Sequence, residues 1–170
     1  VAVKLKMSKD YINNYLNKLS SKEPVPGGGS AAALVGALGS GLIEKVSNFT
    51  VGKERYKSVE PDIRKILKSA GAARKRLEKL IELDQKAYLP VAKAYKLPKD
   101  TQEQQAVRKQ KIEAVMKEAS KAPREIAKLC SELLPYCDKL EKDGNQMLIG
   151  DTKCARAFFE AAIKGAEGVM

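Results

Sequence analysis

The sequence contains no histidine and no tryptophan, and it has only three cysteines. Without histidine the chain cannot form a Ser-His-Asp or Cys-His nucleophile system, an HExxH zinc site or a Glu-x-x-His di-iron centre. Cys130, Cys137 and Cys154 are odd in number and lack CxxC spacing, so we expect reduced, mostly buried thiols and no metal site. Any acid–base chemistry must therefore come from carboxylate, lysine or tyrosine side chains.

Long apolar segments are also missing. No run approaches the roughly 18 apolar residues of a membrane-spanning helix, and the Lys-rich N-terminus lacks the apolar region of a signal peptide. Aromatic residues make up only 5%, whereas Ala, Leu, Lys and Glu dominate, which favours helices over a β-sandwich or barrel. With 170 residues, we expect a cytoplasmic, all-α protein with one domain spanning 1–170 and no membrane partner.

The charge is strongly positive, at +11 from 32 Lys+Arg against 21 Asp+Glu. It fits a Lys-rich solvated surface, a nucleic-acid surface or a site for a polyanionic small molecule. Lys and Glu alternate over residues 75–86, which is typical of an exposed helix face with many ion pairs. This alternation argues against nucleic acid as the partner.

Proline, glycine and capping residues predict a single up-down bundle of about six helices. The long third helix begins near Pro61, has a proline kink at Pro90 and reaches Tyr95. The first predicted helix spans 9–20, with Ser8 as its cap, and the second spans 30–51 and is ended by Gly52. The fourth begins with a capping box formed by Thr101 and Gln104 and ends before Pro123. The fifth spans 124–142, and the last runs from Gly150 or Asp151 to Gly165.

The sharpest local feature is the segment Pro26-Gly27-Gly28-Gly29-Ser30, which runs into a helix rich in Ala and Gly. Three glycines allow a close approach of the backbone, and the helix N-terminus presents free N–H groups, so the segment can hold an anion or polar ligand. A flexible turn capped by Ser30 is the alternative. The small residues over 31–41 predict close contact with another helix, a ligand or a symmetry mate, with ordinary core packing as the alternative.

One carboxylate falls on an apolar helix face. Leu77, Ile81, Asp84 and Tyr88 are spaced four, three and four apart and form one stripe, whereas Glu82 falls on the charged face. A desolvated acid is typical of functional sites, but Asp84 can also serve a structural hydrogen bond. Asp151 is explained by N-capping of the last helix.

These segments resemble the cyclodeaminase/cyclohydrolase family, which comprises the C-terminal half of formiminotransferase-cyclodeaminase and bacterial methenyltetrahydrofolate cyclohydrolases. The similarity spans about residues 20–168. The matching segments are Pro24-x-Pro26-Gly27-Gly28-Gly29-Ser30-Ala31-Ala32-Ala33, Asn48-Phe49-Thr50-Val51-Gly52-Lys53-x-x-Tyr56, Glu82-x-Asp84-x-x-Ala87-Tyr88, Ala94-Tyr95-x-Leu97-Pro98-Lys99, Pro123 with Ile126-Ala127, Gly144-Asn145, Gly150-Asp151 and Gly165-Ala166. Glu82, Gly150 and Gly168 depart from the usual Asp, Ser and Asn, and the chain ends at Met170, where relatives continue for another helix.

The resemblance implies an all-helical homodimer that acts on folates. It implies hydrolysis of 5,10-methenyltetrahydrofolate to 10-formyltetrahydrofolate, or cyclisation of 5-formiminotetrahydrofolate to the methenyl form with release of ammonia. Asp84 is the expected acid–base group, and the family motif adds Glu82 as a second catalytic acid. The implied substrate-binding residues are Pro26, Gly27, Gly28, Gly29, Ser30, Lys53, Lys99 and Asp151. No metal and no cofactor beyond the tetrahydrofolate substrate is expected.

A folate with a polyglutamate tail is a polyanion, which gives the basic surface a role. We expect Lys53 and Lys99, with Arg55 on charge alone, to line the route of that tail. The absence of an attached formiminotransferase domain favours the cyclohydrolase reaction. The alternative from another class is a non-catalytic basic helical module that binds nucleic acid or a protein helix.

Overall fold

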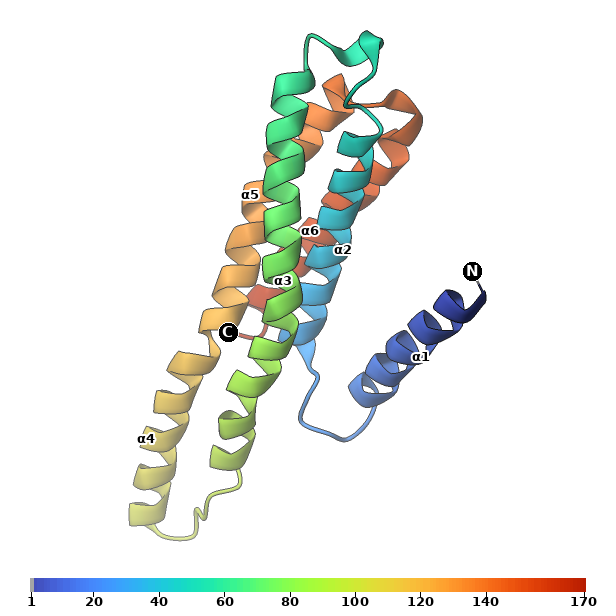
Figure 1. The fold of residues 1–170 in the computed structure, drawn as a ribbon. Helices are drawn as coiled ribbons and strands as arrows, with labels where there is room; N and C mark the ends of the chain where they lie inside the picture. The colour runs from blue at the N-terminus through green and yellow to red at the C-terminus, as the bar shows by residue number, and fades with distance from the viewer. Residues whose placement is uncertain (1) are drawn as a thin grey trace.

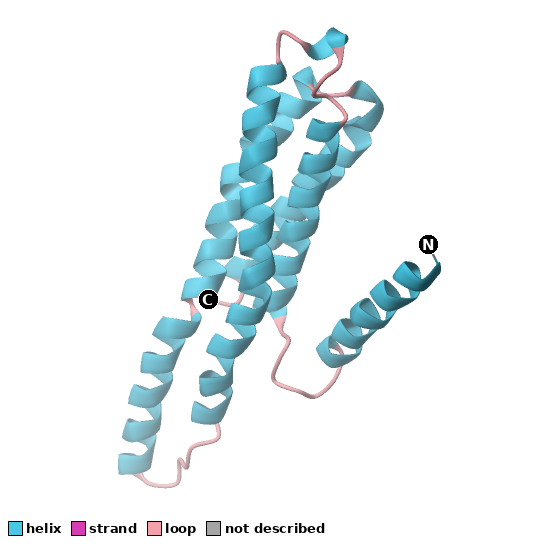
Figure 2. Cartoon of the chain, viewed as in Figure 1, coloured by secondary structure: helices cyan, strands magenta, loops and turns pink. Residues whose placement is uncertain are grey.

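The computed structural model describes residues 2–170, with side chains from residue 11 onward. Over this range the chain forms only helices and loops, which confirms the all-α prediction (Figure 2). The elements are α1 (Ala2–Leu19), α2 (Gly28–Asn48), the short 3-10 helix η1 (Glu54–Tyr56), α3 (Glu60–Ala94), α4 (Gln102–Ala119), α5 (Lys121–Asp143), η2 (Gln146–Leu148) and α6 (Ile149–Glu167). None of the helices in this range has the length and apolar character needed to cross a membrane.

The body of the molecule consists of α2, α3, α5 and α6, which pack against one another (Figure 1). The central helix α2 packs against α3 and α6, and α5 completes the bundle. The end of α3 and the whole of α4 form a hairpin that extends past the body, whereas α1 stands away from it. The C-terminus returns to the place where α4 passes into α5, and this meeting point contains the candidate site described below.

The inward face of α2 is built from small residues, as the sequence predicted. A Cβ atom at Gly36 would lie 2.7 Å from the Cys130 thiol, and one at Gly39 would lie 2.8 Å from the Phe159 ring. Both distances are too short for real contacts, so neighbouring helices approach the α2 backbone here as only glycine permits. The prediction that this face is buried against another helix is confirmed.

Several helix boundaries differ from the prediction. Ser8 was expected to cap the first helix, but that helix begins six residues earlier, at Ala2. Ser30 does not cap α2, because the helix begins at Gly28 with Gly27 in the capping position. Asp151 lies inside the first turn of α6 and is not its cap, which is Leu148. Capping preferences are weak local signals, and packing has moved each helix start toward the N-terminus.

Two other predicted boundary signals, the capping box at Thr101 and the stop at Gly52, are confirmed, whereas the break at Pro123 is not. Thr101 and Gln104 form a full capping box at the start of α4. Gly52 adopts a φ of +78°, which suits glycine in the turn after α2. Pro123 does not separate two helices, because it lies in the first turn of α5, where its missing N–H costs nothing. Pro90 lies inside α3, and the helix continues beyond it to Ala94; the kink there stays a prediction.

The cysteines are mostly buried, as predicted. Cys130 and Cys137 lie in the bundle core, whereas Cys154 is exposed. Burial raises the pKa of the Cys130 thiol to about 12 and that of Cys137 to about 11. The two core thiols therefore stay protonated and unreactive while the bundle is closed.

Candidate active site

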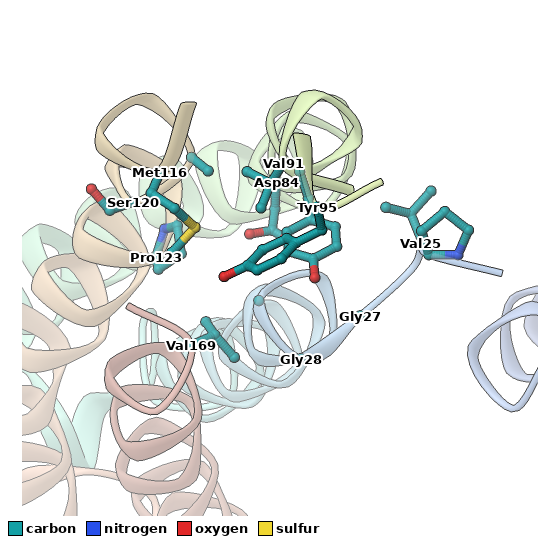
Figure 3. Close-up of a pocket in the computed structure, with 14 residues that line it drawn as sticks. Val25, Gly27, Gly28, Asp84, Val91, Tyr95, Met116, Ser120, Pro123 and Val169 are labelled. Atoms are coloured by element: carbon teal, nitrogen blue, oxygen red, sulfur yellow. The ribbon is translucent and has the colours of Figure 1, made fainter. Parts of the chain in front are cut away.

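A cavity of about 360 Å³ opens where the start of α2, the second half of α3, the α4–α5 junction and the chain end meet. Figure 3 shows the side chains that surround it. They combine one carboxylate, two tyrosines, exposed glycine backbone and apolar groups, the mixture expected of a small-molecule site. The lining residues are Pro24, Val25, Gly27, Gly28, Gly29, Asp84, Tyr88, Val91, Tyr95, Met116, Ala119, Ser120, Pro123 and Val169.

Asp84 is the only acidic residue among the described residues that line the cavity. It is half-buried on α3, where the apolar stripe of the sequence placed it, and Leu77 of the same stripe is fully buried. Burial raises the pKa of the Asp84 carboxyl, and a hydrogen bond from the backbone N–H of Ser30 partly opposes that rise. The result is a carboxylate that holds its proton more tightly than an ordinary aspartate, a property that suits acid–base catalysis.

The glycine turn brings the backbone of α2 directly against this carboxylate. A Cβ atom at Gly29 would overlap the Asp84 carboxylate, and one at Gly28 would lie 2.9 Å from Val169. Gly27 is different, because a Cβ there would meet nothing within 4 Å. The glycines at 28 and 29 therefore let the N-terminus of α2 form one wall of the cavity; that this wall holds a polar ligand stays a prediction.

Two tyrosines on α3, Tyr88 and Tyr95, form a second wall and are both partly exposed. Arg108 of α4 lies over the Tyr95 ring, with its guanidinium carbon 5.5 Å from the ring centre, and donates to the Tyr95 carbonyl at 3.2 Å. This contact fixes the end of α3 and the Tyr95 ring at the edge of the cavity. Val91 and Met116 complete an apolar surface next to the rings.

Behind the cavity a small polar network holds three helices together. The hydroxyl groups of Tyr15 and Ser30 lie 3.0 Å apart in a hydrogen bond, and the Gln85 side-chain amide donates to the Ser30 hydroxyl at 3.1 Å. Ser30 is fully buried and does not line the cavity. It therefore stands one layer behind the site, where it orients the start of α2 relative to Asp84. Pro26 is likewise buried in the turn and outside the lining.

Glu82 does not share the site with Asp84. Its side chain is 75% exposed on the opposite side of α3 and pairs with Lys86 at 3.5 Å. The helical phase predicted this solvent position, although the resemblance placed an acid of the catalytic motif there.

The predicted substrate-binding residues Lys53 and Asp151 lie at the other end of the bundle. Lys53 follows α2 and stacks on Phe49, with its ammonium 5.7 Å from the ring centre. Asp151 pairs with Lys45 at 2.7 Å, near the C-terminal end of α2. Because α2 rises ~1.5 Å per residue, these groups lie roughly 25–30 Å along the helix from Gly28. Within one chain neither residue can reach the cavity.

The remaining basic candidates are also distant from the cavity. Lys99 is exposed in the loop between α3 and α4, where its carbonyl accepts a hydrogen bond from Gln105. Arg55 lies beyond α2, over the ring of Tyr56 at 5.5 Å. The described residues that line the cavity include no Lys or Arg at all.

Sequence reasoning missed Met116, Ser120, Val169 and Tyr15 as parts of the site or its support. None of them carries a local signal, because each reaches the cavity only through the packing of helices far apart in the sequence. Pro123, by contrast, belonged to a matched motif and does line the cavity.

Comparisons with known proteins bear on the family and the overall fold. The family model of formiminotransferase-cyclodeaminase matches residues 11–168. A methenyltetrahydrofolate cyclohydrolase from Methylorubrum extorquens is 36% identical over 155 residues, which cover 91% of this chain and 74% of the relative. A formimidoyltransferase-cyclodeaminase from Mus musculus is 28% identical over 155 residues, which cover 91% of this chain but 29% of the mouse protein. The crystal structure of a formiminotetrahydrofolate cyclodeaminase from Thermotoga maritima matches with a TM-score of 0.79 and 29% identity over 91% of this chain and 73% of that one.

Proposed function

This chain belongs to the formiminotransferase-cyclodeaminase family, and we propose that it is an enzyme that interconverts one-carbon units on tetrahydrofolate. One candidate reaction is hydrolysis of 5,10-methenyltetrahydrofolate to 10-formyltetrahydrofolate. The other is cyclisation of 5-formiminotetrahydrofolate to the methenyl form with release of ammonia. The observation that carries the proposal is a half-buried carboxylate, Asp84, whose pKa is raised in a cavity with aromatic and glycine walls.

The walls suit the parts of a reduced folate. A pterin ring is flat and partly apolar, so the rings of Tyr88 and Tyr95 offer it a stacking surface. Its polar edge can receive hydrogen bonds from backbone N–H groups at the start of α2, beside Gly28 and Gly29. This arrangement directs the reacting carbon toward Asp84, which lines the cavity from the same helix as Tyr88 and Val91.

In the hydrolysis of the methenyl compound Asp84 acts first as a base. A water molecule adds to the methenyl carbon while Asp84 accepts one of its protons, and a tetrahedral carbon results. Asp84 then returns the proton to nitrogen 5 as the bond from that nitrogen to the carbon breaks, which leaves the formyl group on nitrogen 10. The second water proton leaves to solvent. The negative charge of Asp84 also stabilises the cationic folate before the attack.

In the cyclodeaminase reaction the same carboxylate assists the leaving group. Nitrogen 10 attacks the formimino carbon and gives up its proton, and the imine nitrogen takes up a proton, so the ring closes with a tetrahedral carbon that carries an amino group. Asp84 then donates a second proton to this amino group, and ammonia leaves as the methenyl double bond forms. Both reactions need only proton transfer and charge stabilisation, so we propose that no metal or further cofactor takes part. The higher identity to the cyclohydrolase than to the cyclodeaminases supports hydrolysis as the main activity.

We also propose that the protein is a cytoplasmic homodimer. The free cysteines suit a reducing compartment. Exposed apolar side chains on α1 and α2, among them Tyr11, Ile12 and Leu38, suit a subunit contact. Polyglutamylated folate is the proposed substrate form, with basic residues such as Lys53 as partners of the tail.

The experiment is a direct assay of both reactions. The purified chain is mixed with 5,10-methenyltetrahydrofolate, and loss of its near-ultraviolet absorbance is compared with the rate in buffer alone. A parallel assay with 5-formiminotetrahydrofolate follows ammonia release. Acceleration in either assay supports the proposal, and the ratio of kcat/KM values assigns the main reaction. If neither reaction is accelerated, the proposed function is wrong.

A further inference from the structure

The lining of the cavity runs along one face of α3. Asp84, Tyr88, Val91 and Tyr95 all line it and are spaced four, three and four residues apart, which is the spacing of one helix face. At ~1.5 Å per residue this lining extends about 16 Å along the helix axis. Its first end touches the glycine turn at Gly29, and its second end lies where α3 enters the hairpin with α4 (Figure 1). A ligand held at Asp84 can therefore extend along α3 toward Tyr95.

The facing side of α4 leads in the same direction. Met116 lines the cavity, and Ile112 and Arg108 follow at intervals of four residues on the same side of that helix. All three side chains are partly buried. Arg108 meets Tyr95 across the hairpin, with its guanidinium carbon 5.5 Å from the ring centre. The two helix faces thus place Arg108 beside the end of the cavity that is farthest from Asp84.

Arg108 has no anionic partner in the part of the chain that the structure describes. Its guanidinium donates to the Tyr95 carbonyl at 3.2 Å, but its Nε is buried and has no hydrogen-bond partner. No ion pair is formed by residues 87–117, all of which are described. A partly buried guanidinium with unused N–H groups is costly unless a ligand completes its hydrogen bonds. A carboxylate fits this planar set of donors best, because it can accept two parallel hydrogen bonds.

The surroundings of Arg108 are basic as well. Residues 93–111 contain six basic and two acidic side chains, and the basic ones other than Arg108 are exposed. Such an excess of positive charge attracts an anionic ligand to the hairpin. The cavity has its acid, Asp84, at the opposite end, and no Lys or Arg among its described lining residues. An elongated ligand with one anionic end is therefore oriented with that end at the hairpin.

We infer that Arg108 binds the α-carboxylate of the first glutamate in the folate tail, and that this contact sets the direction of the substrate in the cavity. The inference rests on the proposed function for the identity of the ligand. With the reacting carbon at Asp84 and the polar edge of the pterin at the glycine turn, the benzoyl ring and the glutamate extend toward Tyr95.

The length of the substrate fits this placement. The α-carboxylate of the first glutamate lies roughly 10 Å from the reacting carbon when the benzoyl–glutamate part is extended, given bonds of ~1.3–1.5 Å. The contact of the carbon with Asp84 and that of the carboxylate with Arg108 make up the rest of the ~16 Å along α3. Further glutamates attach through the γ-carboxyl, so every folate offers the same α-carboxylate to Arg108.

A substrate without the tail charge tests the contact. 5,10-Methenyltetrahydrofolate is compared with its pteroyl amide, in which a neutral amide replaces the glutamate. Arg108→Gln should raise KM for the glutamate substrate ~10–100-fold and change kcat less than about twofold, because a charged hydrogen-bonded pair is lost far from the reacting carbon. For the amide substrate the same substitution should change KM less than about twofold. Lys109→Gln removes the same charge from the neighbouring exposed position and should leave both KM values unchanged.

Two further comparisons distinguish a specific contact from general attraction. Arg108→Lys keeps the charge but loses the paired geometry, so it should recover only part of the affinity for the glutamate substrate. With a triglutamate substrate, Arg108→Gln should raise KM by the same factor as with the monoglutamate. A larger factor for the triglutamate, or full recovery by Arg108→Lys, would mean that Arg108 only adds to the charge of the hairpin, and the inference would be wrong.

Binding measurements separate this inference from the proposed function. 5-Formyltetrahydrofolate and its pteroyl amide are titrated calorimetrically into the parent and into Arg108→Gln. If the parent prefers the glutamate form and Arg108→Gln loses that preference, but the parent turns over neither the methenyl nor the formimino compound, the proposed function fails and the inference stands. If the parent is active but Arg108→Gln weakens both forms equally, Arg108 only supports Tyr95 and the inference is wrong. If the parent binds neither form, both are wrong.

Discussion

Asp84 and Glu82 are two residues apart on α3 and carry the same chemical group, yet their surroundings differ in every respect. Asp84 faces the cavity, and burial raises its pKa. Glu82 faces solvent and pairs with Lys86 along the helix. Two steps along an α-helix turn a side chain by about 200°, so adjacent acids of one motif can have separate roles. The comparison teaches that position relative to the α2 backbone, and not the type of acid, decides which carboxyl is buried and has a raised pKa.

The largest effect should come from Asp84→Asn. The substitution keeps the size of the side chain but removes its charge and its ability to transfer a proton, so kcat should fall ~10²–10⁴-fold. KM should change only a few-fold, because the tyrosines and the glycine turn remain. Steady-state kinetics with 5,10-methenyltetrahydrofolate provide the measurement, and an unchanged kcat would remove Asp84 from the mechanism. In the parent, kcat/KM should fall with acid below the raised pKa of Asp84.

The next largest effect should come from Gly29→Ala. The new methyl group occupies the space of the Asp84 carboxylate and must displace it, so activity should fall ~10–10²-fold while the carboxylate itself is still present. Gly27→Ala is the matched control, since its Cβ meets nothing within 4 Å and its backbone is extended. Equal activities for the two variants would show that the position of Asp84 is not critical.

A smaller effect should appear in stability. Because Asp84 holds its proton more tightly in the folded chain, its ionisation lowers the free energy of unfolding as the pH rises through its folded pKa. An asparagine amide cannot ionise, so Asp84→Asn should raise Tm at about pH 8 and leave it unchanged at about pH 3. Thermal melts at both pH values provide the measurement. If Asp84→Asn raises Tm by the same amount at both pH values, the difference in stability from the parent comes from hydrogen bonding or packing and not from the charge of Asp84.

The smallest effect should come from Glu82→Gln. Its exposed ion pair with Lys86 is worth little, so kcat should change less than about twofold and Tm hardly at all. The same kinetic assay and melts are used. If Glu82→Gln abolishes turnover while Asp84→Asn does not, the roles of the two acids must be exchanged.

Local periodicity explains what the sequence could predict. Helical phase alone separated Asp84 from Glu82, and glycine and alanine density correctly indicated the buried face of α2. The same reasoning wrongly predicted Ser8 and Asp151 as helix caps. A side chain that is able to cap a helix does so only if packing lets the helix begin at that residue. It also missed Met116 and Ser120, whose proximity to Asp84 depends on the α3–α4 hairpin.

Motifs matched to a family give the order of residues along the chain but not the distances between them in the folded structure. Lys53 and Asp84 belong to neighbouring segments of one family pattern, yet α2 separates them by roughly its whole length within a chain. The family pattern therefore predicted Lys53 as a ligand-binding residue by its type, without indicating how far it lies from Asp84 in the folded chain.

The buried thiol of Cys130 can serve as a probe of how often the helix bundle opens. Its sulfur sits against Gly36 in the middle of α2, and an alkylating reagent can reach it only when α2 separates from α5. Cys154 is exposed and should react at once, so its labelling rate measures the reactivity of the reagent. The rate at Cys130, compared with it, then measures opening of the fold. The slow labelling rate of Cys130 therefore reports how often α2, whose first turn carries Gly29 and forms one wall of the cavity, separates from the bundle.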